Sequence, residues 1–414
     1  MVKFFDAYDL FSPHQFGFRA KFSTDYAIVD IYEKLLSNLD KRLNTCAIFL
    51  DLAKAFDSVS HNILLQKLQR YGIRGNVFNF LQSYLSSRSQ FVKINDVESS
   101  LMNIEFGVPQ GSILGPLLFL IYINDLPEAT NFFIKLFADD TFLCSQNQNL
   151  LHLENEVNHE LHKVFIWLAS NKLTLNIGKS KFMLFSNKKK IKRELCIKIN
   201  GKKLEKCETY KYLGVIFDKN LSWQPHVEYI CGKISKACGA LSKIRHSVDI
   251  ETLKSVYYAL VHSYLRYGVI AWGNATEHVL KPLNSLLNRI VRIMTFAPFR
   301  IGTGPIFNYL KFLNANQIFR LETGKFVFKS KKDLLPISSI VKHFERPTAS
   351  HHHNLRNRRL LITPFELLST FKKKSLYFRG SELWNTMPES LKLSESFNIF
   401  KKYFKLQLLQ GQNG

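Results

Sequence analysis

Three aspartates lie beside apolar segments, where a carboxylate is costly. Asp51 ends the run CAIFLD, and Asp139 and Asp140 lie between two apolar triplets in LFADDTF. If all three stand at strand ends, they could converge on one point of a sheet, where their repulsion would raise their pKa values. Two Mg²⁺ ions about 3.5–4 Å apart would relieve this repulsion and clamp the oxygens of an in-line phosphoryl transfer. An isolated Asp-Asp pair is more commonly an ordinary turn, and the chemistry of these residues alone leaves both interpretations open.

Strand and helix patterns indicate how the chain would position these acids. Residues 44–52 form a near-continuous apolar run that predicts a buried strand. Residues 134–144 predict two short strands around a two-residue acidic tip, and residues 150–171 have helical periodicity. Such a mixture predicts an α/β or α+β unit over residues 1–185. Further helices are predicted over 61–72, 77–85 and 116–127, and the two strands of a hairpin over 90–99 and 101–107.

The later part of the chain has a different pattern. Residues 187–206 are strongly basic and β-like, and they lead into a strand over 210–218. Residues 225–330 are mainly helical in periodicity. We expect the polar, proline-interrupted segment 331–360 to be a basic linker, followed by an amphipathic region over 361–414.

The composition limits the class of protein. The 414 residues include 57 Lys and Arg against 33 Asp and Glu, a net charge of +24, which favours a polyanionic partner over charge for solubility alone. With 46% apolar residues, wholesale disorder is excluded. The six cysteines form no CxxC pair, which indicates a reduced intracellular protein rather than a disulfide or zinc framework. The most apolar stretch, 113–123, has about half of the ~20 residues that a spanning helix needs, so we expect no membrane partner.

Five segments follow one another along the chain: FLDLAKAFDSVSH, GVPQGSILGPLLF, FADDT, WLASNKLTLNIGKSK and YKYLGVIFD. In this order they resemble the palm motifs of reverse transcriptases, in particular the LINE-type RNA-directed DNA polymerases of non-LTR retrotransposons of the jockey and CR1 type. The resemblance covers nearly the whole chain, including QFGFRAKFST before the first motif and two thumb-like and C-terminal stretches near 262–273 and 381–405.

The resemblance implies an α+β right-hand polymerase fold and an assignment of its parts. The palm, an antiparallel sheet with helices, and partial fingers would occupy residues 1–220. A helical thumb would follow over 221–330, then the basic linker over 331–360 and a helical C-terminal region over 361–414.

The resemblance also implies a two-metal centre for nucleotidyl transfer. Asp51, Asp139 and Asp140 match the catalytic carboxylates that bind two Mg²⁺ ions, for which Mn²⁺ can substitute, and the backbone carbonyl of Leu52 would be a further ligand. The 3′ hydroxyl of a DNA primer would then attack the α-phosphate of a dNTP on an RNA template, and pyrophosphate would leave. Asp57 matches a supporting acid of the same motif.

Other matches imply contacts with the nucleotide and the template. Phe56 matches the aromatic residue that packs under the sugar and leaves no room for a 2′ hydroxyl, although from its own sequence context it is simply a core aromatic residue. Gly107, Pro109, Gln110 and Gly111 match the segment that grips the template base and the nucleotide. Without the resemblance, a tight turn before a helix explains these four residues equally well.

Two further assignments follow from the resemblance. Lys179 matches a lysine proposed as general acid for the departing pyrophosphate, with a solvated turn lysine as the alternative. Tyr212, Leu213 and Gly214 match the hairpin that holds the primer end, known as the primer grip.

The function expected from these motifs is that of a retrotransposon reverse transcriptase, an intracellular enzyme with a nuclear stage and a cytoplasmic ribonucleoprotein stage. We also expect an N-terminally truncated enzyme, because only about fourteen residues precede QFGFR, and an endonuclease activity that this chain does not carry. Two alternatives stay open. The chain could be an inactive remnant that binds RNA or an RNA–DNA duplex, or it could be a splicing factor similar to intron maturases, to which its motifs are less similar.

Overall fold

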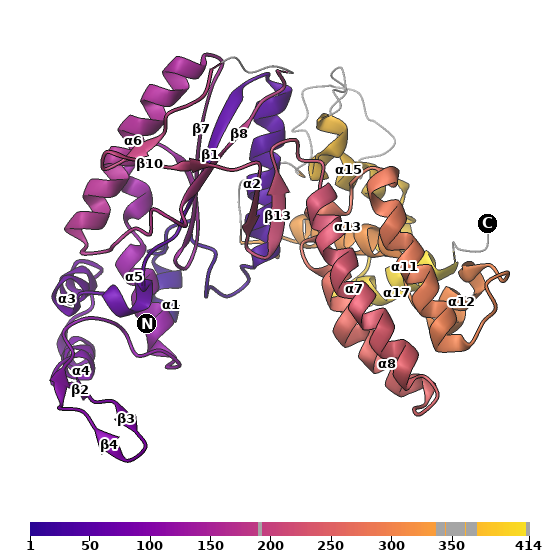
Figure 1. Ribbon diagram of the computed structural model, residues 1–414, viewed down its shortest axis with the longest axis horizontal. Coiled ribbons are helices and arrows are strands. Elements are labelled where there is room, and N and C mark those ends of the chain that lie inside the picture. The colour runs from indigo at the N-terminus through magenta and orange to yellow at the C-terminus, as the bar shows by residue number, and fades with distance from the viewer. Residues whose placement is uncertain (189–192, 337–343, 345–360, 362–370, 411–414) are drawn as a thin grey trace. The chain divides into compact units, whose positions relative to one another are not determined.

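The chain folds into two compact units in the computed structural model, which describes residues 1–188, 193–336, 344, 361 and 371–410. The first unit contains Met1–Ala27 and Arg42–Glu208, and the second contains Ile28–Lys41 and Thr209–Gly414. The first unit combines helices with a sheet, whereas helices predominate in the second (Figure 1). The predicted α+β class is therefore confirmed. Most of the segment 331–360 lies outside the described residues, and the four-part assignment of the chain stays a prediction.

A five-stranded sheet organises the first unit. The central strand β1 is buried along its whole length, as its apolar sequence predicts, and β7 and β8 pair with it in antiparallel register on either side. All neighbouring strands are antiparallel except β11, which runs parallel to β8. The order across the sheet is β11 (Glu205–Lys206), β8 (Lys181–Phe185), β1 (Asn44–Leu50), β7 (Asp140–Asn147) and β6 (Phe133–Phe137).

Helices and short hairpins complete the first unit. The predicted helices over 61–72, 77–85, 116–127 and 150–171 are all present. The predicted hairpin over 90–107 consists of two nested pairs of two-residue strands, so the segment 90–99 bends back on itself. The elements are α1 (Val2–Ala7), η1 (Ala55–Ser58), α3 (His61–Arg70), α4 (Gly75–Leu85), β2 (Ser89–Gln90), β3 (Lys93–Ile94), β4 (Val97–Glu98), β5 (Met102–Asn103), α5 (Leu114–Ile123), η2 (Leu126–Ala129), α6 (Leu150–Ser170), β9 (Lys198–Ile199) and β10 (Lys202–Lys203).

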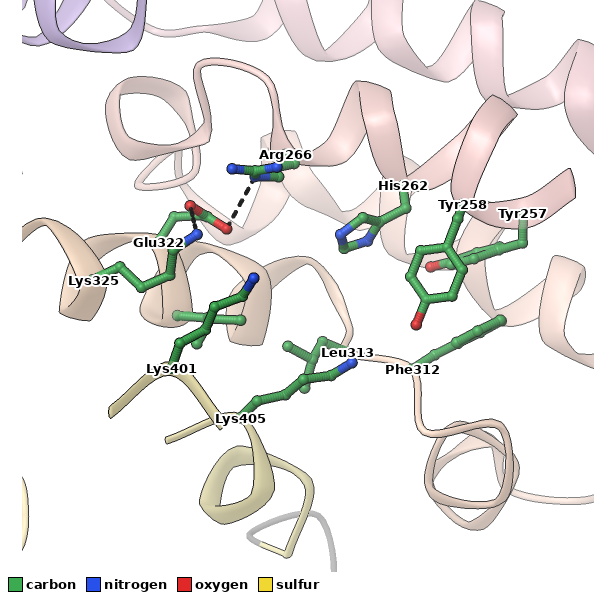
Figure 2. Close-up of a pocket in the computed structure, with 11 residues that line it drawn as sticks. Tyr257, Tyr258, His262, Arg266, Phe312, Leu313, Glu322, Lys325, Lys401 and Lys405 are labelled. Carbon is green, nitrogen blue, oxygen red and sulfur yellow. Dashed lines mark hydrogen bonds and ion pairs between the residues drawn. The ribbon is translucent and has the colours of Figure 1, made fainter. Parts of the chain in front are cut away.

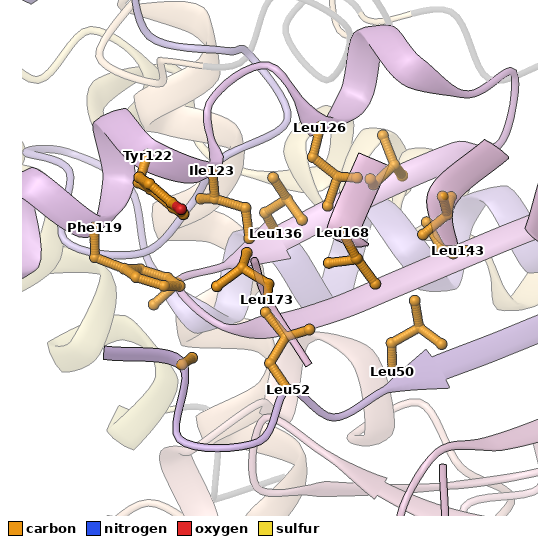
Figure 3. Packing of buried hydrophobic residues seen from close by; sticks show 14 of the residues in the cluster. Leu50, Leu52, Phe119, Tyr122, Ile123, Leu126, Leu136, Leu143, Leu168 and Leu173 are labelled. Atoms are coloured by element: carbon orange, nitrogen blue, oxygen red, sulfur yellow. The ribbon is translucent and has the colours of Figure 1, made fainter. Parts of the chain in front are cut away.

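The hydrophobic core of this unit fixes the backbone on both sides of Asp51. Leu50 and Leu52 are 3% and 7% exposed and belong to one cluster with the apolar residues of α5 (Figure 3). Because successive side chains of a strand point to opposite faces, burial of both neighbours directs Asp51 away from this cluster. Packing of Leu50 and Leu52 thus keeps the Asp51 side chain pointing out of the core.

Helices form most of the second unit, as the periodicity over 225–330 predicts. A hairpin of β12 and β13 opens it, and α2 packs with this unit from Ile28 onward. No helix of the described residues is long and apolar enough to cross a membrane. The elements are α2 (Thr24–Asp40), β12 (Thr209–Tyr212), β13 (Val215–Asp218), α7 (Gln224–Ile244), α8 (Ile250–Tyr257), η3 (Tyr258–His262), α9 (Ser263–Arg266), α10 (Val269–Trp272), α11 (Glu277–Thr295), α12 (Thr303–Leu310), α13 (Ala315–Lys331), η4 (Lys372–Lys374), α15 (Leu376–Thr386), α16 (Glu389–Lys392) and α17 (Phe397–Gln410).

A buried carboxyl group joins α2 to the C-terminal helices. Glu33 on α2 accepts hydrogen bonds from the Ser375 hydroxyl and the Leu376 backbone N–H, both at 2.6 Å, at the start of α15. The pKa of Glu33 is raised to about 7, mainly because burial removes water from the carboxyl group, although the two hydrogen bonds partly oppose this effect. Glu33 therefore keeps its proton in the folded chain at pH values at which the unfolded chain has lost it.

This raised pKa predicts a loss of stability of the second unit as the pH rises. Between about pH 4.5 and pH 7 the unfolded carboxyl group ionises while the folded one stays protonated, which favours the unfolded state by about 3 kcal/mol across the interval. Urea unfolding at about pH 5 and about pH 8 should show this difference, and Glu33→Gln should lack that part of it. If the stabilities of the two proteins depend equally on pH, the pKa of Glu33 is the same in the folded and the unfolded chain.

Candidate active site

The three aspartates lie at the ends of neighbouring strands in the first unit. Asp51 directly follows β1, and Asp140 is the first residue of β7. Leu50 pairs with Thr141, so Asp51 and Asp140 are the next two residues outward along the same pair of strands. The tip of the β6–β7 hairpin is Ala138–Asp139, because Phe137 pairs with Asp140. The predicted turn of Asp139 and Asp140 is therefore wrong by one residue. Asp139 lies in the turn, whereas Asp140 belongs to β7.

The charge of Asp51 lies close enough to affect the protonation of Asp139 and Asp140. The pKa of Asp139 is raised, first by removal of water and then by the charge of Asp51. The pKa of Asp140 is raised to about 6 by removal of water, followed by the charges of Asp139 and Asp51. All three thus contribute to one concentration of negative charge.

This donor set suits a hard divalent cation, which prefers carboxylate oxygens. A cation would also relieve the repulsion that raises the two pKa values. Among the described residues, however, no three His, Cys, Asp or Glu side chains are grouped so that they could hold a metal ion. The chemistry of the three carboxylates therefore fits the metal, whereas their present conformation does not form a closed ligand set.

The segment QFGFR supports the turn that carries Asp139. The side-chain oxygen of the fully buried Gln15 accepts hydrogen bonds from the backbone N–H groups of Gly17 at 2.8 Å and Ala138 at 3.0 Å. Phe16 donates its N–H to the carbonyl of Leu136 at 2.8 Å. Ala138 has a φ of 55°, which a residue with a Cβ adopts only at a cost. The hydrogen bond from Gln15 helps to hold this backbone conformation next to Asp139.

Gly17 is required by the same contact. A Cβ on this residue would lie 2.5 Å from the Ala138 nitrogen, so any side chain would push the turn away. Sequence reasoning recognised the segment QFGFRAKFST but assigned no role to Gln15 or Gly17. The only indication in the sequence was that both residues lie in a segment that resembles the family. Their contacts with the Ala138 turn are visible only in the structure.

Removing the Gln15 acceptor should destabilise the first unit. In a Gln15→Leu variant the buried N–H groups of Gly17 and Ala138 would lose their partner, at a cost of about 1–3 kcal/mol. Urea unfolding measures this change. Gln148→Leu is the control, because Gln148 is exposed. Equal stability of the two variants would contradict the role of Gln15.

A second loop holds the backbone of Asp51. The N–H of Asp51 donates to the Ser180 hydroxyl at 3.1 Å, and its carbonyl accepts from the N–H of Asn176 at 2.8 Å. Leu52 forms a bridge with Leu175, in which Asp51 and Ala53 make the flanking hydrogen bonds. The Leu52 carbonyl, a predicted metal ligand, is thus not used by this bridge.

Lys179 belongs to the same loop and precedes Ser180. Its side chain is exposed, and its backbone N–H donates to the carbonyl and the side-chain oxygen of Asn176. The structure therefore brings the backbone of this segment to Asp51. The role of the lysine side chain stays a prediction.

Phe56 lies on the short helix η1, directly after the Asp51 segment. Its ring stacks on Phe119 of α5, with the centroids 4.5 Å apart and the planes at 28°. The ring of Phe18 meets it edge to face at 6.4 Å. Phe56 is half-buried, so packing holds one face of the ring while part of it stays accessible.

The GVPQGS segment packs against η1. Gly107 has a φ of 90°, and a Cβ there would lie 3.1 Å from the Asp57 backbone. Val108 donates its N–H to the carbonyl of Phe56 at 2.9 Å. The exposed amide of Gln110 donates to the Asp57 carboxylate at 2.8 Å. Asp57, expected as a supporting acid, thus orients Gln110.

The other two residues of this segment shape its turn. Gly111 has a φ of 79°, which glycine adopts at little cost. The carbonyl of Pro109 accepts a hydrogen bond from the Ser112 hydroxyl at 2.7 Å, close to the start of α5. The segment is therefore a tight turn before a helix, and this geometry is compatible with both interpretations of the sequence.

Tyr212, Leu213 and Gly214 belong to the second unit. Leu213 and Gly214, with φ values of 45° and 77°, form the two-residue turn between β12 and β13. The carbonyl of Leu213 accepts a hydrogen bond from the Tyr267 hydroxyl at 2.7 Å, and a Cβ on Gly214 would lie 2.9 Å from the Tyr267 ring. The predicted strand over 210–218 is therefore a hairpin whose turn is fixed by Tyr267.

The first half of the chain is similar to reverse transcriptases. The family model described as reverse transcriptase (RNA-dependent DNA polymerase) matches residues 1–217. The chain is 27% identical over 304 residues to the probable RNA-directed DNA polymerase from transposon X-element of Drosophila melanogaster, covering 71% of this chain and 33% of that protein. The polymerase from mobile element jockey of the same species is 26% identical over 310 residues, which cover 72% and 33%.

A third relative and a solved structure extend the comparison. The probable RNA-directed DNA polymerase from transposon BS of Drosophila melanogaster is 25% identical over 372 residues, covering 87% of this chain and 39% of that protein. The chain thus spans between a third and two fifths of the length of these relatives. Telomerase from Candida albicans, solved with a fragment of telomeric RNA, aligns at a TM-score of 0.41 and 13% identity over 76% of this chain and 56% of that chain. Because the reverse transcriptase model matches more than half of the residues, the chain belongs to the reverse transcriptase (RNA-dependent DNA polymerase) family.

Proposed function

We propose that this chain is an RNA-directed DNA polymerase of a retrotransposon, a nucleotidyltransferase that extends a DNA primer on an RNA template. The observation that carries the proposal is the convergence of Asp51, Asp139 and Asp140 at neighbouring strand ends within the family match. Membership of the family implies dependence on a divalent metal, generally Mg²⁺. The net charge of +24 suits a duplex that is recognised through its phosphates.

In this proposal the three carboxylates and the Leu52 carbonyl hold two divalent cations. When bound, the cations would neutralise the carboxylates and polarise the phosphate oxygens of the dNTP. The chain itself supplies positioning, which is most of what phosphoryl transfer requires of a protein. Core packing on both sides of Asp51 and the Gln15 contact at Ala138 keep the acid-bearing backbone in place before substrate binds.

Other residues would position the substrates. Phe56 would lie under the sugar of the dNTP, and Gln110 would contact the template base from a turn shaped by Gly107, Pro109 and Gly111. Tyr212, Leu213 and Gly214 would hold the primer end. Lys179 would donate a proton to pyrophosphate. Copying retrotransposon RNA would place the chain in a cytoplasmic ribonucleoprotein and then in the nucleus.

Primer extension tests the activity directly. The purified chain should add dNTPs to a DNA primer annealed to RNA, and chelation of Mg²⁺ by EDTA should abolish the addition. A control reaction without template measures untemplated addition. The alternative function is binding without synthesis. It would be supported if the chain binds the RNA–DNA duplex but does not extend it with either Mg²⁺ or Mn²⁺, and that result would overturn the proposed activity.

A further inference from the structure

A small cavity lies in the helical second unit. Its volume is about 270 Å³, and its walls come from α8, η3, α9, α13, α17 and the segment after α12 (Figure 2). This volume is slightly below the roughly 300–1,000 Å³ of sites for drug-sized ligands. The cavity is therefore suited to one small ligand or to a single unit of a polymer.

The lining of the cavity is strongly basic. Arg266, Lys325, Lys401 and Lys405 provide four positive charges against the one negative charge of Glu322, which gives 4 − 1 = +3. Glu322 is already shared, because it accepts from Lys325 at 2.5 Å and pairs with Arg266 at 3.3 Å. Most of the positive charge is therefore not neutralised by the lining itself.

The two lysines of α17 lie one helical turn apart on the same wall. Figure 2 shows both side chains reaching from α17 toward the opposite wall of the cavity. Within the part of the chain that the structure describes, neither Lys401 nor Lys405 forms an ion pair or hydrogen bond. An anion in the cavity would give these ammonium groups a partner.

Two titratable groups of the lining bind protons less readily than they would in water. Burial lowers the pKa of Lys405. The pKa of His262 is lowered to about 4, mainly by burial and then by the charge of Lys405, while Glu322 opposes the shift. Burial without a counterion disfavours the charged form of both groups. Anion binding would reverse that effect.

Aromatic rings form another wall. Tyr257 and Phe312 are 1% exposed and stack at 3.9 Å, which makes a rigid apolar base. Tyr258 meets Phe312 edge to face at 5.6 Å and is 41% exposed. Tyr258 and His262 lie on η3, a π-helical turn, and such turns occur frequently at functional sites. The exposed Tyr258 ring is available for stacking within the same cavity as the cations.

We propose that this cavity binds a nucleotide through its base and its phosphate. The base would stack on Tyr258, and the phosphate would lie among Arg266, Lys401 and Lys405. The ligand could be a free nucleotide or one nucleotide of a single strand, since stacking on an aromatic ring and contact with cations recognise both. This site goes beyond the proposed polymerase function and uses none of the three aspartates, so it is testable without primer extension.

Histidine NMR and calorimetry on the full chain test the site in buffer with EDTA. The probes are inorganic phosphate, AMP and a short oligouridylate. The His262 resonance, identified by its loss in a His262→Gln variant, should shift on addition of AMP, and the pKa of His262 should rise. A double Lys401→Ala, Lys405→Ala variant should bind AMP about tenfold more weakly. Lys402→Ala is the matched control, because Lys402 is exposed on α17 and outside the cavity lining.

Variants of Tyr258 test the base. Tyr258→Leu should weaken AMP binding about tenfold and leave phosphate binding unchanged, while Tyr258→Phe should keep both. Binding of AMP alone would assign the cavity to free nucleotides, and binding of the oligouridylate would assign it to a single strand. The proposal is overturned if neither nucleotide probe shifts His262, if Lys402→Ala loses as much affinity as the double variant, or if Tyr258→Leu leaves AMP affinity unchanged.

Discussion

An Asp139→Asn variant should lose about a thousandfold in the rate of primer extension while keeping its fold. Asn has nearly the shape of Asp but lacks the negative charge that a hard cation prefers. Loss of several kcal/mol of metal-dependent stabilisation of the transition state corresponds to roughly three factors of ten. Steady-state extension on an RNA template, with the wild-type chain alongside, measures the loss.

The same substitution should not lower stability. Removal of water, followed by the charge of Asp51, raises the pKa of Asp139, so its ionised form is disfavoured in the folded chain. Replacing it with a neutral amide removes one partner of a repulsive pair. Thermal unfolding in EDTA should therefore occur at an unchanged or higher temperature. A residue that only supported the fold would behave in the opposite way.

A second hairpin tip offers a matched control. Asp96 also lies in a two-residue turn, between β3 and β4, and its side chain is 97% exposed. Its ion pair with Lys93 is exposed and contributes little to stability. Asp96→Asn should extend primers as the wild type does. Full activity of Asp139→Asn would remove this residue from the proposed centre, and equal losses in the two variants would show a general effect of charge.

The strands that carry the acids could be predicted because each is a local apolar run. The sequence 44–52 predicts β1 and the position of Asp51 at its end, and both are observed. The register of the β6–β7 hairpin could not be predicted, because Ala138 adopts a backbone conformation that its residue type does not favour. That conformation depends on Gln15, 123 residues earlier in the chain. A contact of this kind leaves no periodic pattern.

The sequence also did not predict that α2 belongs to the helical unit. Its amphipathic sequence is compatible with packing against a sheet or against helices. The buried Glu33, bonded to the start of α15 343 residues later, has no counterpart in a local pattern. The basic cavity could not be predicted either, because its cations come from α9, α13 and α17 and only folding brings them together. The motif resemblance pointed to the three aspartates of the proposed centre but gave no indication of these long-range contacts.

Phe56→Val should increase the use of ribonucleotides relative to deoxyribonucleotides by about a hundredfold. In the proposed site the ring blocks the space of a 2′ hydroxyl, and discrimination by such contacts corresponds to about one to two factors of ten. Phe119 supports the ring by stacking at 4.5 Å, so the blocking atoms are held in place before the nucleotide binds. The ratio of kcat/KM for dCTP and CTP in single-nucleotide extension measures the change.

The substitution also removes packing, and this effect must be separated from selection of the sugar. Phe56 is half-buried, so shortening it should cost about 1–2 kcal/mol of stability. Phe182→Leu is the control, because Phe182 is 1% exposed on β8 and should lose stability without a change in the kcat/KM ratio. Phe56→Tyr keeps the ring and should keep selection for dCTP. An unchanged ratio in Phe56→Val, with extension intact, would show that sugar selection depends on other residues and that Phe56 serves the core with Phe119.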